Sequence, residues 1–256
     1  MHSAAAPAAF HVLPEDIATY HSQGFIRLRN VFTAAEAGQY RTAVDGVFAG
    51  NGGHRGNSDM FKQVVNLWEL HPGLRALTFH PKVLAIAKAL AGGAPLRLWH
   101  DQVLMKPPGA KPTVPHQGQT NWSHTCSPQS NAMTFWIALN DAPAERGCMG
   151  FIPGSHRHWD LPRQQSLADP RGLYALRPEF EWEQVVTLPL RAGDLTVHHA
   201  YTAHSAGGNL SDQPRHGYII DFMDADTTFR PIPHPLTDGL GLHPGDRFDL
   251  PQFPLV

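Results

Sequence analysis

Residues 193–223 read GDLTVHHAYTAHSAGGNLSDQPRHGYIIDFM, and this stretch decides the fold. Leu195–His199 and Tyr218–Met223 read as two short strands, and the Gly-, Asn- and Pro-rich segment between them favours turns. Other strand-like runs lie earlier in the chain, at Leu96–Met105, Ala132–Leu139, Cys148–Ile152 and Val185–Leu190. Short strands at loop-separated intervals are typical of an antiparallel sandwich or barrel.

The N-terminal part of the chain carries helix signals instead. Pro14 opens a helix that is expected to stop at Gly24, with Pro at its start and Gly just past its end. Thr33-x-x-Glu36 is a capping box for a helix running towards Ala49, and His80–Leu90 reads as another helix. Helices followed by strands predict a mainly β fold with a helical buttress, in which the core is a double-stranded β-helix of the jelly-roll or cupin-like kind.

The organisation of the chain follows from the same patterns. We find no internal repeat and no linker, so residues 1–256 are expected to form a single domain. Residues 51–59 are rich in Gly and Asn and are predicted to form a loop. Residues 156–183 are long and irregular, which favours a lid or substrate loop. Residues 224–256 are Pro-rich and are expected to pack as an extended tail.

Composition excludes several classes of protein. The formal net charge of −2 gives no electrostatic case for binding a nucleic acid polymer or a membrane surface. No apolar run approaches the roughly 20 residues that span a bilayer, and the N-terminus lacks a signal-peptide pattern, so a cytoplasmic location is expected. The two cysteines, Cys126 and Cys148, form no CxxC motif. With 17 histidines, imidazole is the plausible metal ligand.

Two histidines stand in segments that suit metal binding. His116 and His204 can offer neutral imidazoles to Fe(II) from neighbouring strands, and such sites leave positions open for a cosubstrate and oxygen. The alternative is that each is an ordinary polar histidine. His124, His198 and His199 are competing candidates, and the last two belong to the predicted strand Leu195–His199.

From about Leu13 to Phe222 the chain resembles the phytanoyl-CoA dioxygenase family of Fe(II)/2-oxoglutarate enzymes. Several blocks carry this resemblance in the expected order: Trp99-His100-Asp101-Gln102, Lys106-Pro107-Pro108-Gly109, Val114-Pro115-His116-Gln117, the run from Gly147 to His156, Gly193-Asp194, His204, Asn209-Leu210-Ser211 and Arg215. The resemblance implies that Fe(II), 2-oxoglutarate and O2 are the cofactors, and that His116 and His204 are the iron ligands.

The resemblance also implies a cosubstrate site. Arg215 is expected to clamp the distal carboxylate of 2-oxoglutarate, since a guanidinium matches a carboxylate with two hydrogen bonds; a structural salt bridge is the alternative. Gln102 and Lys106 are further candidates for this site. Many relatives place a hydroxyl residue two positions after the arginine, where this chain has Gly217. Thr134 is therefore expected to supply the hydroxyl.

Gly118 departs from the aspartate that the family usually places two residues after the first histidine. In the halogenase branch of the superfamily, Gly or Ala stands there and chloride takes the vacated position on the metal. The resemblance thus implies chlorination of an unactivated aliphatic carbon by hydrogen abstraction and chloride rebound. The alternatives are a hydroxylase or desaturase that holds a water there or borrows a carboxylate such as Asp101, and a non-catalytic small-molecule-binding relative.

Other residues are candidates for a substrate and halide pocket: Thr120, Asn121, Trp122, Trp136 and Arg177. The substrate is expected to be a free small molecule that needs no carrier protein. The resemblance points to the sugar of a deoxyadenosine monophosphate, in nucleoside-antibiotic biosynthesis. A phosphate of that kind would need one or two of the arginines that surround the irregular middle segment, namely Arg146, Arg157, Arg171 and Arg177.

Overall fold

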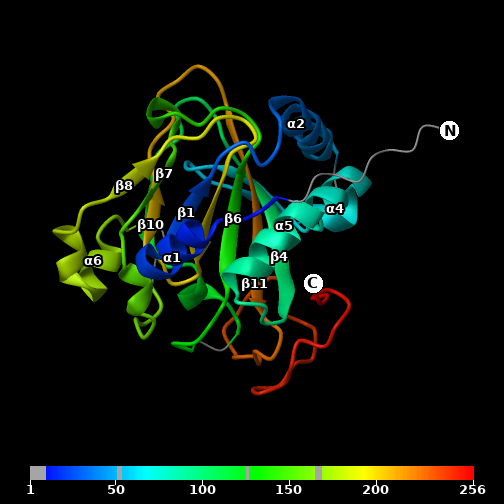
Figure 1. Cartoon of the computed structure of the whole chain (residues 1–256), viewed down its shortest axis with the longest axis vertical. Helices are drawn as coiled ribbons and strands as arrows, with labels where there is room; N and C mark the ends of the chain where they lie inside the picture. Colours follow the sequence, from blue (N-terminus) through cyan, green and yellow to red (C-terminus); the bar gives the residue numbers. More distant parts are fainter. Residues whose placement is uncertain (1–9, 51–53, 125–126, 165–168) are drawn as a thin grey trace.

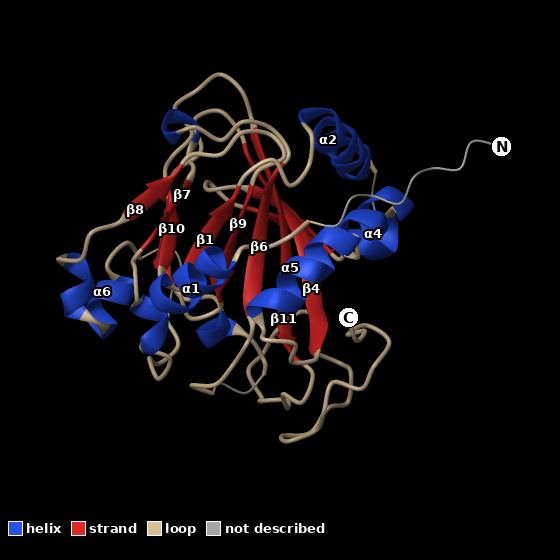
Figure 2. Cartoon of the chain, viewed as in Figure 1, coloured by secondary structure: helices blue, strands red, loops and turns tan. Residues whose placement is uncertain are grey.

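The computed structural model describes residues 10–50, 54–124, 127–164 and 169–256. Its strands form two antiparallel sheets, one with seven strands in the order β1-β9-β6-β11-β4-β3-β2 and one with four in the order β5-β10-β7-β8 (Figures 1 and 2). The strands are β1 Phe25–Leu28, β2 His54–Asn57, β3 Lys62–Val65, β4 Leu96–Lys106, β5 Thr113–His116, β6 Met133–Ala138, β7 Met149–Phe151, β8 Val186–Leu188, β9 Leu195–His199, β10 His204–Ala206 and β11 Arg215–Asp224.

The longer helices cover one face of the seven-stranded sheet, and the four-stranded sheet lies towards its other face (Figure 1). The helices are α1 Pro14–Gln23, α2 Ala34–Ala49, α3 Leu67–Leu70, α4 Pro72–Thr78, α5 Pro81–Leu90 and α6 Gly172–Leu176, with 3-10 turns η1 Gln119–Asn121, η2 Ala144–Arg146, η3 Ser155–Arg157 and η4 Pro178–Glu181. The helix α5 buries Val83, Ile86 and Leu90 in the main apolar core, which also contains Phe135 and Ile220 of the sheet.

The strand β4 shows how the alternation of side chains divides the sheet into a core face and a pocket face. Val103 packs in the helix-side core, and the Asp101 carboxylate accepts hydrogen bonds from the backbone of Trp68 and from two hydroxyls on that same side. His100, Gln102 and Leu104 line the pocket on the other face. A strand places successive side chains on opposite faces, so the pocket residues follow from register alone.

The C-terminal segment after β11 closes one end of the sheets. Residues 225–256 contain no named helix or strand, and the segment is described throughout. Phe253 stacks on Trp99 with ring centroids 5.3 Å apart, and Phe248 packs edge-on against the same indole at 5.6 Å. Pro233, His234 and Pro235 line the pocket between the sheets. The predicted extended tail is therefore also a wall of the pocket.

The mainly β architecture with some helices confirms the broad expectation from the sequence. The helices expected after Pro14, Thr33 and His80 are present. The loop predicted for residues 51–59 is wrong in part, because His54–Asn57 pairs with β3; residues 51–53 lie outside the described part of the chain. No described helix has the length and apolar character needed to cross a bilayer.

Gly193 occupies a tight crossing that admits no side chain. Its φ is +91°, and a Cβ added there would lie 2.1 Å from the carbonyl oxygen of Phe32. We expect Gly193→Ala to lower the free energy of unfolding by about 3 kcal/mol, since a left-handed backbone and overpacking each cost about 1–2 kcal/mol or more. Gly239→Ala is the matched control, because Gly239 has φ +83° and open space around it. Urea unfolding of both variants measures the difference; equal losses would contradict the close approach.

Candidate active site

A cavity of about 440 Å³ lies between the two sheets. The seven-stranded sheet contributes side chains from β3, β4, β6, β9 and β11, and the four-stranded sheet contributes side chains from β5, β7 and β10. This volume is in the range of small-molecule sites, which combine apolar walls with a few polar groups. His116, His204, Gly118 and Arg215 all line this one cavity.

His116 and His204 are directly opposed residues of β5 and β10. Their ring centroids are 4.2 Å apart. The Nδ1 atom of His116 lies 2.9 Å from the carbonyl oxygen of Val114, and Nδ1 of His204 lies 2.9 Å from that of Thr202. A carbonyl oxygen only accepts, so the proton of each neutral ring is on Nδ1.

The two rings are therefore prepared for a metal at their other nitrogen. Burial lowers the pKa of His116, and burial together with His116 and His198 holds the pKa of His204 well below its usual range. Both rings are neutral at pH 7, and Nε2 of each carries a lone pair. A backbone carbonyl that holds the Nδ1 proton is the usual outer support of a metal-bound histidine.

Gly118 lines the cavity two residues after His116. Its backbone is ordinary right-handed helical, with φ −63° and ψ −56°, so no conformational constraint requires a glycine. A Cβ added there would meet Trp122 Cζ2 at 3.5 Å and the Ala200 carbonyl oxygen at 3.7 Å, which are normal contacts. A Cβ would fit at this position, and the chain does not provide one.

Arg215 is a buried cation without a carboxylate partner among the described residues. It is 2% exposed, donates from Nη1 to the carbonyl oxygen of Gly147, and leaves Nε without a hydrogen bond. Burial lowers its pKa to about 10, so it remains charged at pH 7. An unpaired buried charge is costly, so this position suits an anionic ligand rather than the structural salt bridge considered above.

Two neighbours strengthen the anion site. Lys106 is opposite Arg215 in the β4–β11 pairing; it donates from Nζ to the carbonyl oxygen of Lys111, and burial beside Arg215 lowers its pKa to about 7. Lys106 is not among the residues that line the cavity. Arg215 lies over the ring of Trp136, with Cζ 5.0 Å from the centroid, and Nε1 of Trp136 is buried without a hydrogen bond.

Gly217 explains why the expected hydroxyl residue is absent after the arginine. A Cβ there would lie 2.3 Å from Cζ2 of Trp136, so the indole occupies that space. Thr134 does not replace the hydroxyl, because it pairs with Asp221, six residues or about 20 Å along β11 from Arg215. The structure thus does not bring Thr134 to Arg215, and the free donor beside the arginine is the Trp136 indole.

Thr134 and Gln102 instead gather around Asp221. The Thr134 hydroxyl and the Gln102 side chain both hydrogen-bond to the Asp221 carboxyl, and the Gln63 amide donates to Gln102. Nδ1 of His100 is 3.4 Å from Oδ2 of Asp221. Burial raises the pKa of Asp221 to about 7 and lowers that of His100 to about 3. The expected cosubstrate role of Gln102 is also weakened, because it lies about 13 Å along the sheet from Arg215.

Only some of the residues predicted for the substrate pocket line the cavity. Trp122 and Trp136 line the cavity, whereas Thr120 donates to the carbonyl oxygen of Gln117 and is not among the lining residues. Arg177 pairs with Glu179 at 3.6 Å and also lies outside the lining. The side chain of Asn121 lies outside the described part of the structure.

Sequence reasoning missed several lining residues, among them His100, Asp221, His234, Arg163 and Gln63. For His100 a signal was available, because it precedes Gln102 by two positions on a predicted strand and therefore shares its face. Asp221 could have been found in the same way, because it follows Arg215 by six positions on one strand and therefore shares its face. His234 and Arg163 come from irregular segments, where no periodicity indicates which side chains turn inward.

Of the three competing histidines, only His198 lines this cavity. His198 lines the cavity with its ring centroid 4.4 Å from that of His204, while His199 contacts the carbonyl oxygen of Ser130. His124 is buried beside Gln119 and lies outside the lining, and Asp101 is on the helix side of β4. Among the described residues, no group of three His, Cys, Asp or Glu side chains is arranged to hold a metal ion. His116 and His204 therefore stand as a pair.

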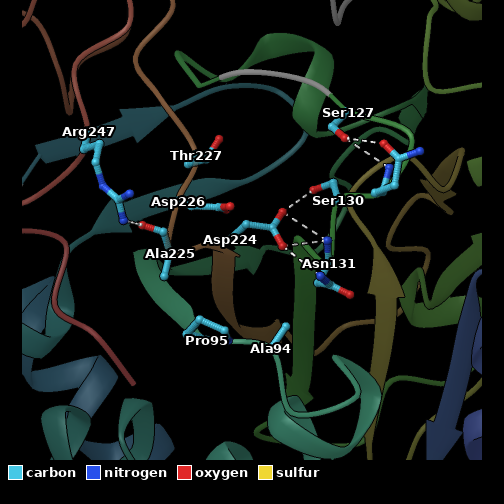
Figure 3. Close-up of a pocket in the computed structure, with 11 residues that line it drawn as sticks. Ala94, Pro95, Ser127, Ser130, Asn131, Asp224, Ala225, Asp226, Thr227 and Arg247 are labelled. Atoms are coloured by element: carbon cyan, nitrogen blue, oxygen red, sulfur yellow. Dashed lines mark hydrogen bonds between the residues drawn. The ribbon is translucent and has the colours of Figure 1, made fainter.

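A second hollow, of about 430 Å³, lies at the far end of β11 (Figure 3). Its principal charged group, Asp224, accepts from Ser130 Oγ and from the backbone and amide of Asn131, as Figure 3 shows. Arg247 donates to the carbonyl oxygen of Ala225. The lining contains no histidine, so the cavity between the sheets is the stronger candidate.

The donor set of that cavity fits a mononuclear iron, 2-oxoglutarate-dependent enzyme. Two neutral imidazoles from neighbouring strands of one sheet would hold the metal, and the buried Arg215 would hold a carboxylate. Comparison with known proteins supports this class. The family model for phytanoyl-CoA dioxygenase matches residues 20–217, so the chain belongs to the phytanoyl-CoA dioxygenase family.

Individual relatives agree with this assignment. Phytanoyl-CoA dioxygenase domain-containing protein 1 from Rattus norvegicus is 33% identical over 159 residues, which are 60% of this chain and 54% of that protein. Phytanoyl-CoA dioxygenase from Arabidopsis thaliana is 31% identical over 162 residues, or 62% of this chain and 56% of that protein. The chain therefore spans about half the length of the curated relatives that it matches.

Two solved structures match over nearly their whole length. The non-heme alpha ketoglutarate dependent carbocyclase SnoK from nogalamycin biosynthesis is 35% identical, with a TM-score of 0.83 and 96% of each chain covered. The epimerase SnoN in complex with Fe3+, alpha ketoglutarate and nogalamycin RO is 35% identical, with a TM-score of 0.80, and the match covers 94% of this chain and 97% of SnoN. These neighbours support an enzyme of the iron/2-oxoglutarate type.

Replacing the buried guanidinium tests the anion site. We expect Arg215→Gln to weaken 2-oxoglutarate binding about 10- to 150-fold, the equivalent of about 1.5–3 kcal/mol for a charge-assisted hydrogen bond. Anaerobic titration of the Fe(II)-loaded protein, followed by the visible charge-transfer band, measures the dissociation constant. Arg177→Gln should leave it unchanged, because Arg177 lies outside the cavity. Equal effects of the two variants would rule out Arg215 as the clamp.

Proposed function

We propose that this chain is a non-haem Fe(II)/2-oxoglutarate-dependent halogenase that chlorinates an unactivated aliphatic carbon of a free small molecule. The observation that carries the proposal is Gly118, where the backbone accepts a side chain but the chain supplies none. The family usually has an aspartate at this position. An external chloride would take the place of that carboxylate.

The surroundings of Gly118 suit an anion. Two neutral histidines leave the charge of Fe(II) uncompensated, so a negative ligand is favoured in a buried cavity. Trp122 lies beside this position, with Cζ2 3.5 Å from a Cβ added at Gly118, so its indole would be the neighbour of an external ligand there.

The other residues of the cavity would position the reactants. Iron, 2-oxoglutarate and O2 together supply the oxidising power that removes a hydrogen atom from the substrate. Arg215 would bind the distal carboxylate of 2-oxoglutarate, with the Trp136 indole N–H as a second donor. The substrate would lie towards the opposite end, so that its carbon is held nearer to the halide than to the oxygen.

The residues that line the cavity do not select one class of substrate. A nucleotide such as deoxyadenosine monophosphate stays a prediction from resemblance, because none of Arg146, Arg157, Arg171 and Arg177 lines the cavity. Arg163, at the edge of the cavity, is the one arginine besides Arg215 in the described lining. It lies in the segment that we propose as a lid, of which residues 165–168 are outside the described structure.

A second candidate function is hydrogen abstraction that ends in ring closure or inversion rather than halogenation. The observation that favours it is the match to a carbocyclase and to an epimerase over nearly the full length of the chain. A hydroxylase with a water beside Gly118 is a further form of the same chemistry. These activities need no halide, so the response to chloride separates them from the first proposal.

The test is a comparison of two substitutions at one position. In the wild-type protein loaded anaerobically with Fe(II) and 2-oxoglutarate, chloride should shift the visible charge-transfer band in a saturable way. Gly118→Asp should abolish the shift, because its carboxylate would fill the anion position. Gly118→Ala should keep it, since a Cβ makes only normal contacts there.

The alanine variant is the matched control for the added side chain. A wild-type band that is normal but indifferent to chloride would overturn the halogenase proposal and favour the halide-independent activities. Absence of a band in all three proteins would indicate a relative that no longer binds iron.

A further inference from the structure

His100 and Asp221 form a polar pair that the proposed chemistry does not use. They are directly opposed on β4 and β11, and both side chains line the cavity. The register of the two strands shifts just beyond Asp221, so that Trp99 has no partner. His100 is 6% exposed and Asp221 is 2% exposed, which makes this a buried acid–imidazole pair inside the pocket.

The orientation of the His100 ring leaves one nitrogen for a ligand. Nδ1 is turned towards Asp221, 3.4 Å from Oδ2, and is buried without a hydrogen bond. Nε2, the other ring nitrogen, makes no hydrogen bond with the described residues, and the side chain lines the cavity. Contacts of this length are common in ligand-free sites and tighten when the ligand binds.

Asp221 is itself held firmly. It accepts hydrogen bonds from the Thr134 hydroxyl and the Gln102 side chain, and Gln63 in turn donates to Gln102. Three polar side chains thus fix the carboxyl against which the imidazole rests. A buried network of this kind is costly unless each group is satisfied, and Nε2 of His100 has no partner in the described protein.

The pair lies at the end of the cavity away from the proposed cosubstrate clamp. Asp221 is six residues from Arg215 on the same strand, about 20 Å at the usual rise per residue. Trp122 and His234 lie near this end, because Trp122 contacts the His100 ring and His234 contacts the neighbouring Trp99. Pro233 and Pro235 flank His234 and also line the cavity. His100 and Asp221, together with Thr134, Gln102 and Gln63, form the polar part of this end, and Trp122, Pro233 and Pro235 form its flat apolar part.

We propose that His100, positioned by Asp221, binds a hydroxyl group carried on a flat, largely apolar ring of the substrate. A hydroxyl both donates and accepts, so it satisfies Nε2 in either protonation state of the pair. The aromatic and proline faces suit the ring that carries it. The inference rests on the proposed function only in taking this cavity as the substrate chamber; it does not depend on chloride.

Two probes with the same ring system, one with a hydroxyl and one with a methoxy group, test the hydroxyl. We expect 2-naphthol to bind the anaerobic Fe(II)- and 2-oxoglutarate-loaded protein at least about tenfold more tightly than 2-methoxynaphthalene, as one buried hydrogen bond allows. Calorimetry at pH 8 keeps the Asp221 carboxyl largely ionised and Nε2 an acceptor. His100→Phe should remove the preference, His100→Gln should keep part of it, and Asp221→Asn should reduce it.

Controls separate this proposal from the others. His243→Phe changes an exposed histidine outside the cavity and should leave the tenfold ratio intact. The charge-transfer band should persist in His100→Phe, which shows that the variant is folded and still binds iron and cosubstrate. Absence of saturable 2-naphthol binding, equal binding of the two probes, or a ratio that survives His100→Phe would overturn the proposal. A missing chloride response alongside the expected ratio would count against the halogenase and leave this inference standing.

Discussion

The pairing of β5 with β10 is the constraint on which the proposed metal site depends. It places His116 directly opposite His204, and a carbonyl two residues before each histidine holds the Nδ1 proton. Burial then keeps both rings neutral. A slip of one residue would turn one imidazole to the other face of the sheet. Short strands that contribute little to the core thus determine the chemistry of the cavity.

The cavity has two electrostatically different ends on one long strand. Arg215 forms a positive end with no carboxylate partner among the described residues. Asp221 forms an acidic end, where its charge is shared among hydrogen bonds. A dicarboxylate cosubstrate and a mostly neutral substrate would therefore bind in opposite directions from the iron. Gly118 lines the same cavity as the two histidines, where a protein carboxylate would otherwise be available to bind the metal.

Much of this arrangement could be predicted from the sequence. Capping and turn residues indicated the helices after Thr33 and His80, and apolar runs indicated the longer strands. The roles expected for His116, His204 and Arg215 came from resemblance, and the structure brings all three to one cavity. Thr134 was expected beside Arg215, but the register of β6 against β11 places it opposite Asp221 instead. The sequence of a strand does not give its register against a neighbouring strand. The tail's contribution of His234 depends on a path with no regular hydrogen bonding, so no periodic pattern indicates it.

The central claim is that the iron takes an external anion at the position left open by Gly118. X-ray absorption at the iron edge tests it most directly, on the anaerobic Fe(II)- and 2-oxoglutarate-loaded protein in bromide instead of chloride. The account predicts a bromine scatterer in the first coordination shell, absent when Gly118 is replaced by aspartate. A first shell of nitrogen and oxygen alone, unchanged between bromide and halide-free buffer, would contradict it.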